Sequence, residues 1–199
     1  MQNKPFSQSC EKNKNPIFSV LAPQLKKLSH VVEIGSGMGQ HAQFFTQQLP
    51  HLTWQTTDQG EYLGPLTEVI EAENAERLPK PLKLDVTQSP WPIKDCECIY
   101  TANTLHIMSL DNVEMFFDGV GKALVENGHL YIYGPFNYEG QYTSPSNERF
   151  DQWLINQHPL SAIRDIEKII ELANKNNIQL VDDHEMPANN RLLCFIKTQ

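Results

Sequence analysis

Glycines at alternate positions mark the segment of the sequence best suited to chemistry. The run 31–40 reads VVEIGSGMGQ and lies where a buried strand is expected to lead into a helix. Glycines there let the backbone turn sharply and leave room for a ligand close to the main chain. A dinucleotide-binding fingerprint requires GxGxxG, and Gln40 occupies the place of its last glycine. The residues predicted to line this site are Glu33, Gly35, Ser36, Gly37 and Gly39.

The GxGxG spacing, with an acid two residues before its first glycine, resembles the S-adenosylmethionine (SAM) site of class I methyltransferases. Two acids at the ends of later strands support this interpretation. Asp58 follows the second expected strand, and a carboxylate there can accept hydrogen bonds from both ribose hydroxyls. Asp85 ends the third expected strand, and the resemblance implies that it accepts a hydrogen bond from the adenine amino group. Taken singly, each acid is more often a strand-end or helix-cap residue.

A second polar cluster, TANTLHIM at residues 101–108, follows the fourth expected strand. Ligands of open α/β sheets bind beyond the carboxyl ends of the strands, where Asn103 and His106 would lie. The intrinsic pKa of histidine suits a general base. We predict His106 as the proton acceptor, with Asn103 and Asn137 as orienting groups, and Asn103 also beside the cofactor. The alternative is that His106 packs in a loop and Asn137 satisfies turn backbone.

Four segments are expected to converge into a substrate pocket at the same edge of the sheet. They are the N-terminal arm near Asn13, the 103–106 loop, the 136–142 segment and the 189–191 turn. Each carries polar or aromatic residues where a plain connector would need none. Arg191 could neutralise a substrate carboxylate or phosphate, although a solvated arginine is as common. The residues predicted to bind substrate are Asn13, Tyr138, Asn189 and Arg191.

The elements that must position these residues alternate between short apolar runs and helical patterns. This alternation predicts βαβ units around a parallel sheet. Strands are expected at 30–34, 53–57, 82–86, 96–100, 129–133, 179–185 and 191–197. Helices are expected from Asn15-Pro16 with a kink at Pro23, at 40–49 and 65–75, from a capping box at Asp111 to 124, and at 147–156 and 163–173. The last two strands are too close for a crossover and must form an antiparallel hairpin.

The expected fold is therefore α/β and Rossmann-like, of the class I methyltransferase type, with a seven-stranded mixed sheet and helices on both faces. A length of 199 residues indicates about one domain, taken here as residues 1–199. Within it, residues 1–28 form an N-terminal arm and helix. Residues 134–160 form an insert over the active site, because a long irregular segment is uncommon unless it is functional.

Composition excludes several classes of function. The net charge of −8, from 16 basic and 24 acidic residues, argues against nucleic acid as a partner. No apolar stretch reaches 18 residues and the polar N-terminus lacks the apolar core of a secretory signal, so no membrane partner is expected. Four sparse cysteines suit a reducing cytoplasm. Strand alternation separates the neighbours in Asp182-Asp183-His184, so no metal site is expected. The oligomeric state is left open.

The sequence is identified as a member of the methyltransferase-like DUF938 family. The motifs that carry the resemblance span nearly the whole chain and are VVEIGSGMGQHA, LPHLTWQTTD, TANTLHIMS, YIYGPFNYEGQYTSPSNERFDQWL, IRDIE and MPANNRLLCF. The resemblance implies a class I methyltransferase fold and SAM as the cofactor, without naming a substrate. At Lys12, relatives commonly carry arginine, so a cation is kept but a bidentate contact is not.

These observations favour a SAM-dependent methyltransferase acting on a small molecule held under the 134–160 insert. Because the methyl sulfonium is already a strong electrophile, the protein need only orient the acceptor, exclude water and at times remove a proton. The fourth strand is followed by no NPPY-type or DPPY-type motif, which weakens a nucleic-acid amino group as the acceptor. Two alternatives stay open: a non-catalytic SAM-binding or partner-binding protein, and a nicotinamide-dependent oxidoreductase, which the GxGxG spacing disfavours.

Overall fold

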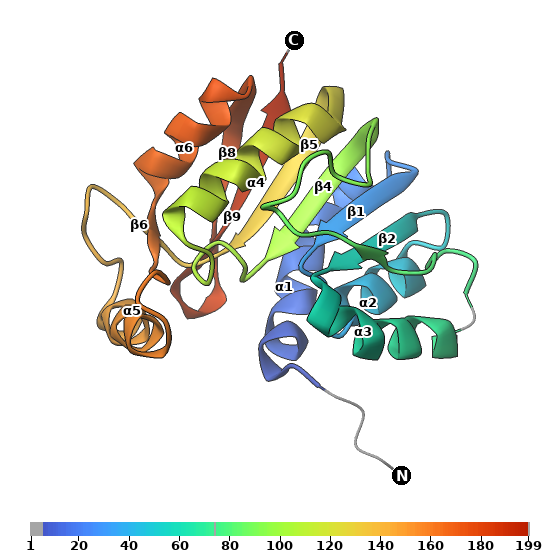
Figure 1. The fold of residues 1–199 in the computed structure, drawn as a ribbon, viewed down its shortest axis with the longest axis horizontal. Coiled ribbons are helices and arrows are strands. Elements are labelled where there is room, and N and C mark those ends of the chain that lie inside the picture. The colour runs from blue at the N-terminus through green and yellow to red at the C-terminus, as the bar shows by residue number, and fades with distance from the viewer. Residues whose placement is uncertain (1–5, 74, 199) are drawn as a thin grey trace.

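The protein is built around a mixed seven-stranded sheet, seen in a computed structural model that describes residues 6–73 and 75–198. The strand order is β3-β2-β1-β4-β5-β9-β8, and β9 runs antiparallel to both of its neighbours, β5 and β8 (Figure 1). The strands of this sheet are β1 (His30–Ile34), β2 (Thr53–Asp58), β3 (Leu82–Lys83), β4 (Cys96–Ala102), β5 (Leu124–Gly134), β8 (Ile178–Met186) and β9 (Asn190–Lys197). The predicted fold class and the C-terminal hairpin are confirmed.

Helices cover both faces of the sheet. They are α1 (Gln8–Leu25), α2 (Gln40–Gln48), α3 (Gly60–Glu73), α4 (Leu110–Ala123), α5 (Pro145–Gln157) and α6 (Ile166–Lys175). The apolar residues of α1, α2 and α3 share one core cluster, and those of α4 and α6 share the other. Figure 1 shows α4 and α6 on the near side of the sheet.

Alternation along the strands divides the core between the two faces. In β1, Val31 packs in the cluster of α1 and α2, whereas Val32 packs in the cluster of α4 and α6. In β4, Tyr100 and Ile99 divide in the same way. Because side chains of a strand point alternately to opposite faces, Glu33 is directed toward the face that α1 and α2 cover.

The carboxyl ends of the parallel strands define the edge at which the site forms. β1, β2, β4 and β5 all end there, and the antiparallel β9 begins there, since Gly134 pairs with Arg191. The turn between β8 and β9, a short 3₁₀ helix at Pro187–Asn189, therefore lies at the same edge. Figure 1 shows α5 at this edge too.

The first helix differs from its prediction. α1 begins eight residues before the expected Pro16, with Ser7 as its N-cap, and it runs without a break through Pro16 and Pro23. Each proline removes one backbone hydrogen bond. The buried side chains of Ile17 and Leu21 keep the helix packed on the sheet across both positions.

Further boundaries were predicted wrongly, including the start of β5, which lies at Leu124 and not at 129. β3 stops at Lys83, before the expected end at 86. α3 starts at Gly60 and includes Pro65, where a helix start was expected. The N-cap of α4 is Ser109, whose side chain accepts a hydrogen bond from the backbone N–H of Asn112, so the predicted capping box at Asp111 is not formed.

The segment after β5 is more ordered than its composition indicated. Ser144 caps α5, and its hydroxyl accepts a hydrogen bond from the backbone N–H of Asn147. A two-stranded parallel sheet joins β6 (Phe136–Asn137) to β7 (Arg164–Asp165), which delays α6 to Ile166. Within the part of the chain that the structure describes, no helix has the length and apolar character needed to cross a bilayer.

Candidate active site

The three glycines between β1 and α2 have different surroundings. Gly35, Gly37 and Gly39 have positive φ angles of 72°, 55° and 70°, a conformation that favours glycine. A Cβ atom at Gly35 would lie 2.7 Å from Thr104 Cγ2, and one at Gly39 would lie 2.9 Å from Ile70 Cδ1. At Gly37 a Cβ atom would meet no atom within 4 Å. Two glycines therefore allow close packing, and Gly37 alone of the three faces open space.

The carboxylate of Asp58 lies beside this open position. Its Oδ2 accepts a hydrogen bond from the backbone N–H of Gly37 at 2.7 Å, and its Oδ1 accepts one from Gln59 at 2.8 Å. Burial raises the pKa of Asp58, and these two hydrogen bonds oppose that shift. Ser36 fixes the turn against β2, since its N–H and Oγ both bond to the backbone of Thr57. The glycine turn and Asp58 thus form one hydrogen-bonded unit.

Asp85 follows β3 and is engaged within its own turn. Its Oδ1 accepts hydrogen bonds from the backbone N–H of Thr87 at 2.9 Å and from the Thr87 hydroxyl at 2.8 Å. This is the bonding of a turn-forming aspartate, and it explains why β3 ends early. A role for Asp85 at the adenine stays a prediction.

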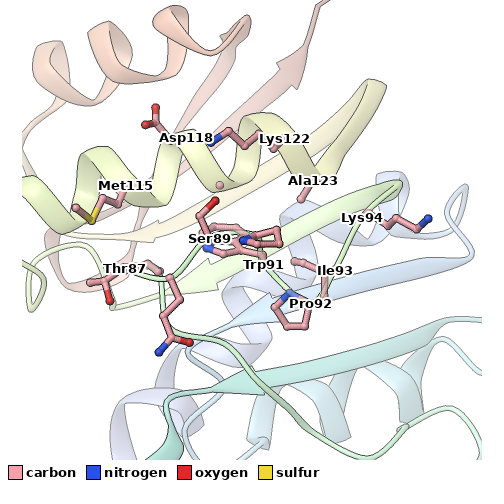
Figure 2. Close-up of a pocket in the computed structure, with 14 residues that line it drawn as sticks. Thr87, Ser89, Trp91, Pro92, Ile93, Lys94, Met115, Asp118, Lys122 and Ala123 are labelled. Carbon is pink, nitrogen blue, oxygen red and sulfur yellow. The ribbon is translucent and has the colours of Figure 1, made fainter.

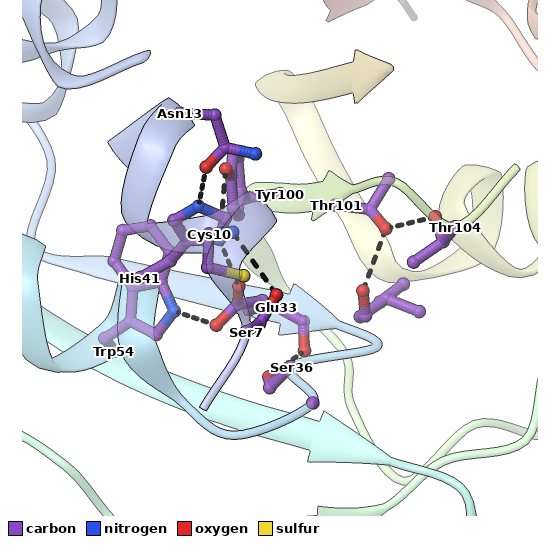
Figure 3. A network of polar contacts seen from close by, with 12 residues as sticks. Ser7, Cys10, Asn13, Glu33, Ser36, His41, Trp54, Tyr100, Thr101 and Thr104 are labelled. Carbon is purple, nitrogen blue, oxygen red and sulfur yellow. Dashed lines mark hydrogen bonds and ion pairs between the residues drawn. The ribbon is translucent and has the colours of Figure 1, made fainter. Parts of the chain in front are cut away.

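Glu33 lies in a buried polar network beneath α1 (Figure 3). Its Oε2 accepts a hydrogen bond from Trp54 Nε1 at 2.9 Å, and its Oε1 lies 3.4 Å from His41 Nδ1. His41 Nε2 in turn lies 2.7 Å from Asn13 Oδ1. The carboxylate therefore joins β1, β2 and α2, and through His41 it is tied to the first helix.

The start of α1 is held by the residues that follow the glycine turn. The backbone of Ser7 forms two hydrogen bonds with the side chain of Gln40, of 2.6 and 3.2 Å. Together with the Asn13–His41 contact, they fix the N-terminal half of α1 over the beginning of α2. This half of the helix therefore belongs to the site.

A cavity of about 370 Å³, here called the strand-end pocket, lies beyond β4 and β5. Its walls come from α1, the loop after β4, the end of β5, α5 and the turn before β9. The lining residues are Ser9, Lys12, Asn13, Asn103, Tyr133, Pro135, Ser146, Asn147, Phe150, Pro187, Ala188 and Asn190. Of the predicted residues, Asn13 and Asn103 line the pocket, and Asn189 lies between two residues that do.

Tyr133 occupies the base of the strand-end pocket at the end of β5. Its carbonyl accepts a hydrogen bond from the backbone N–H of Asn103 at 2.8 Å. Burial raises the pKa of its hydroxyl, while hydrogen bonds from Asn190 and Asn13 act in the opposite direction. Asn103 has a φ of 59°, a left-handed conformation that asparagine tolerates well. These residues place amide and phenol groups at the expected position of an acceptor.

His106 lies next to the strand-end pocket and is not among its lining residues. Its ring contacts the ring of Phe150, with 5.3 Å between centroids. Burial, together with the nearby charge of Arg164, lowers the pKa of His106 to about 4, although Asp151 opposes the shift. The imidazole is therefore neutral at neutral pH and a weak proton acceptor.

Asn137 and Tyr138 also lie outside the lining of the pocket. Asn137 is buried in β6, and its Oδ1 accepts no hydrogen bond among the described residues. The Tyr138 hydroxyl donates to Asp183 at 2.7 Å. Arg191 donates to the same carboxylate at 2.7 Å and lies over the Tyr138 ring, so its charge is already paired.

Asn189 ties the hairpin turn to α5. Its Nδ2 donates to the Ser146 hydroxyl at 3.1 Å, and its carbonyl accepts a hydrogen bond from Asn147 Nδ2 at 3.0 Å. These bonds hold two walls of the strand-end pocket together. Asn189 therefore shapes the pocket, and its predicted role in binding substrate stays a prediction.

The sequence analysis did not select ten of the twelve residues that line the pocket as site residues, among them Lys12, Tyr133, Asn147, Phe150 and Asn190. A signal existed for Lys12, because positions 9, 12 and 13 lie on one face of a helix. Using it required a helix that starts at Ser7, and the polar sequence there shows no apolar periodicity. Among the described residues, no group of three or more His, Cys, Asp or Glu side chains is placed to hold a metal ion.

A larger cavity of about 630 Å³ lies between the 86–94 loop and α4 (Figure 2). Trp91 packs there against Gly119, where an added methyl group would overlap the indole ring. None of the predicted site residues lines this cavity. The strand-end pocket is therefore the better candidate for the substrate.

Solved structures with the same fold are methyltransferases. The structure of human N-acetylserotonin methyltransferase in complex with SAM matches with a TM-score of 0.83 at 12% identity, over 96% of this chain and 53% of that one. The mitomycin 7-O-methyltransferase MmcR matches with a TM-score of 0.76 at 15% identity, over 96% and 58% of the chains. PigF with SAH matches with a TM-score of 0.80 at 12% identity, over 94% and 56%.

This chain thus spans a little over half the length of these solved proteins. At such low identity, the likeness shows a shared Rossmann-like methyltransferase fold. The family described as "Protein of unknown function (DUF938)" matches residues 4–197. Since that match covers nearly the whole sequence, the chain belongs to the DUF938 family and has the fold of class I methyltransferases.

Proposed function

We propose that the protein is a SAM-dependent methyltransferase that acts on a small molecule. The observation that carries the proposal is the open space at Gly37 beside the Asp58 carboxylate. A ligand can approach the backbone there, where the packed Gly35 and Gly39 leave no room. The SAM complex of N-acetylserotonin methyltransferase, which has the same fold, supports the choice of ligand.

The residues of the glycine turn fit such a cofactor. Asp58 would accept hydrogen bonds from the ribose hydroxyls, and Asp85 would meet the adenine through its free carboxylate oxygen. The backbone at Gly37 would lie along the ligand. Glu33, bonded to Trp54 and close to His41, would hold the turn in shape. When bound, SAM supplies a methyl group on a positively charged sulfur.

The strand-end pocket would hold the acceptor. Asn103 and Tyr133 supply hydrogen-bonding groups that could orient the attacking atom. Of the three predicted catalytic residues, Asn103 is best supported, because it alone lines the pocket. His106, with a pKa of about 4, has little capacity to hold a proton at neutral pH. The geometry therefore favours catalysis by positioning, with the acceptor's proton passing to solvent.

Calorimetry with SAM, S-adenosylhomocysteine (SAH) and NAD tests the binding step. We expect both sulfur compounds to bind and NAD to give no heat. Binding of NAD alone would overturn the proposal in favour of an oxidoreductase. Release of SAH from SAM in the presence of a library of small molecules tests catalysis. Tight SAM binding without turnover of any acceptor would instead favour the non-catalytic alternative.

A further inference from the structure

The strand-end pocket has a charge opposite to that of the protein. The chain carries a net charge of −8, with 24 acidic residues. The described residues that line the pocket nevertheless include one cation, Lys12, and no carboxylate. Lys12 is therefore the one charged side chain among the described residues that line the pocket.

The charge of Lys12 is not neutralised by its neighbours. Lys14, two positions along α1, is paired with Glu11 at 2.5 Å. Arg191, the other cation at this edge, is paired with Asp183 at 2.7 Å and with Glu185 at 3.3 Å. None of the ion pairs between described residues involves Lys12.

The backbone that carries Lys12 is held in place. Asn13, the next residue, is buried and bonded to His41, so the base of the lysine side chain has a fixed position in the pocket. Lys12 is exposed at the rim of the pocket, where its ammonium group can bind a negative charge. A single ammonium group acts as a point charge, and one positive charge balances one carboxylate.

Part of the pocket wall is apolar and includes an aromatic ring. Phe150 lines one side, and its ring is supported by Trp153, with 5.8 Å between centroids and 14° between the planes. His106 supports the same ring from another direction. Pro135 and Pro187 add further apolar surface. A volume of about 370 Å³ suits a molecule with one or two rings.

We infer that the molecule bound in the strand-end pocket is a small planar carboxylate, whose negative charge is held by Lys12 and whose ring packs against Phe150. The inference rests on the proposed function, since it names the class of acceptor for that site. Asn103 and Tyr133 then lie where they can bond to the polar edge of the ring. No other described residue of the pocket offers a positive charge.

The test uses two probes of nearly equal shape, 4-hydroxybenzoate and 4-hydroxybenzamide, which differ in charge. Each is titrated into the full chain saturated with SAH. We expect the wild type to bind the carboxylate about five- to tenfold more tightly than the amide. Lys12→Met should remove this preference, and Lys12→Arg should keep it. Lys14→Met is the matched control on the same helix and should behave as the wild type.

Two results would overturn the inference: equal affinity for the two probes in the wild type, or a carboxylate preference that survives in Lys12→Met. Failure of 4-hydroxybenzoate to bind the wild type would overturn it as well. Repeating the titrations without SAH separates this inference from the proposed function. A Lys12-dependent preference in a protein that binds no SAM or SAH would refute the methyltransferase and leave the anion site standing.

Discussion

Replacing Gly37 by alanine probes the cofactor site with one added carbon. The φ of 55° at Gly37 is unfavourable for an L-residue by about 1–2 kcal/mol, and the new Cβ would touch no protein atom within 4 Å. The loss of stability should therefore come from the backbone alone. For a chain of this size, it corresponds to a fall in Tm of about 2–8 °C.

Gly140 provides a matched control for this substitution. It has a φ of 70°, and a Cβ atom there would also meet nothing within 4 Å. Gly140→Ala should therefore cost a similar amount of stability. Because it lies in the exposed turn after β6, it should leave SAM binding unchanged.

The two variants should differ in their affinity for SAM. A methyl group placed where a ligand packs against the backbone costs about 1–3 kcal/mol, by analogy with overpacking of a core. For Gly37→Ala, this predicts a Kd about 5- to 150-fold higher, measured by calorimetry at a temperature where both variants are folded. A folded Gly37→Ala protein with the affinity of Gly140→Ala would show that no ligand approaches the backbone at Gly37, and would refute the reasoning.

Three other predictions concern single residues. Asp58→Asn should raise the Kd for SAM about 10- to 100-fold by removing a charge-assisted hydrogen bond, and calorimetry that finds an unchanged Kd would limit Asp58 to holding Gly37. His106 stays neutral in the folded protein down to about pH 4, whereas the unfolded chain takes up this proton near pH 6.5. Between these values the unfolded state binds more protons, so the free energy of unfolding should fall by about 2 kcal/mol from pH 7 to pH 5. Urea titrations of the wild type and His106→Gln check this, and equal pH dependence in both would contradict the assignment. Gly119→Ala should displace Trp91 and cost about 1–3 kcal/mol of stability in thermal unfolding, while SAM affinity stays the same. Weakened SAM binding in that variant would mean that the cavity beside α4 is connected to the cofactor site.

The parts of the fold that depend on local pattern could be predicted from the sequence. The apolar run of β1 and the glycines after it are contiguous, so the strand and its turn were both evident. The hairpin of β8 and β9 followed from the short separation between two strand-like runs. Long-range pairings were not evident: β6 and β7 have two residues each and lie far apart in the chain. The early start of α1 also depends on distant contacts, those of Ser7 with Gln40 and Asn13 with His41.

In the candidate site, too, local features could be predicted from the sequence and long-range contacts could not. The sequence placed the three glycines in one turn but could not distinguish Gly37 from its neighbours, because the difference lies in Thr104 and Ile70. It also directed attention to Arg191, whose charge is paired with Asp183 in the folded chain. Pairing of this kind depends on the register of β8 and β9, which composition and spacing do not determine.

The buried contacts of His41 have a consequence for the order and strength of ligand binding. His41 follows the glycine turn, and through Asn13 it connects that turn to the helix that carries Lys12. The proposed cofactor and acceptor sites therefore share one continuous set of polar contacts. If the first ligand tightens or loosens these contacts, the binding free energy of the second ligand changes. Because such coupling is reciprocal, the factor by which SAM changes the affinity for the acceptor must equal the factor by which the acceptor changes the affinity for SAM.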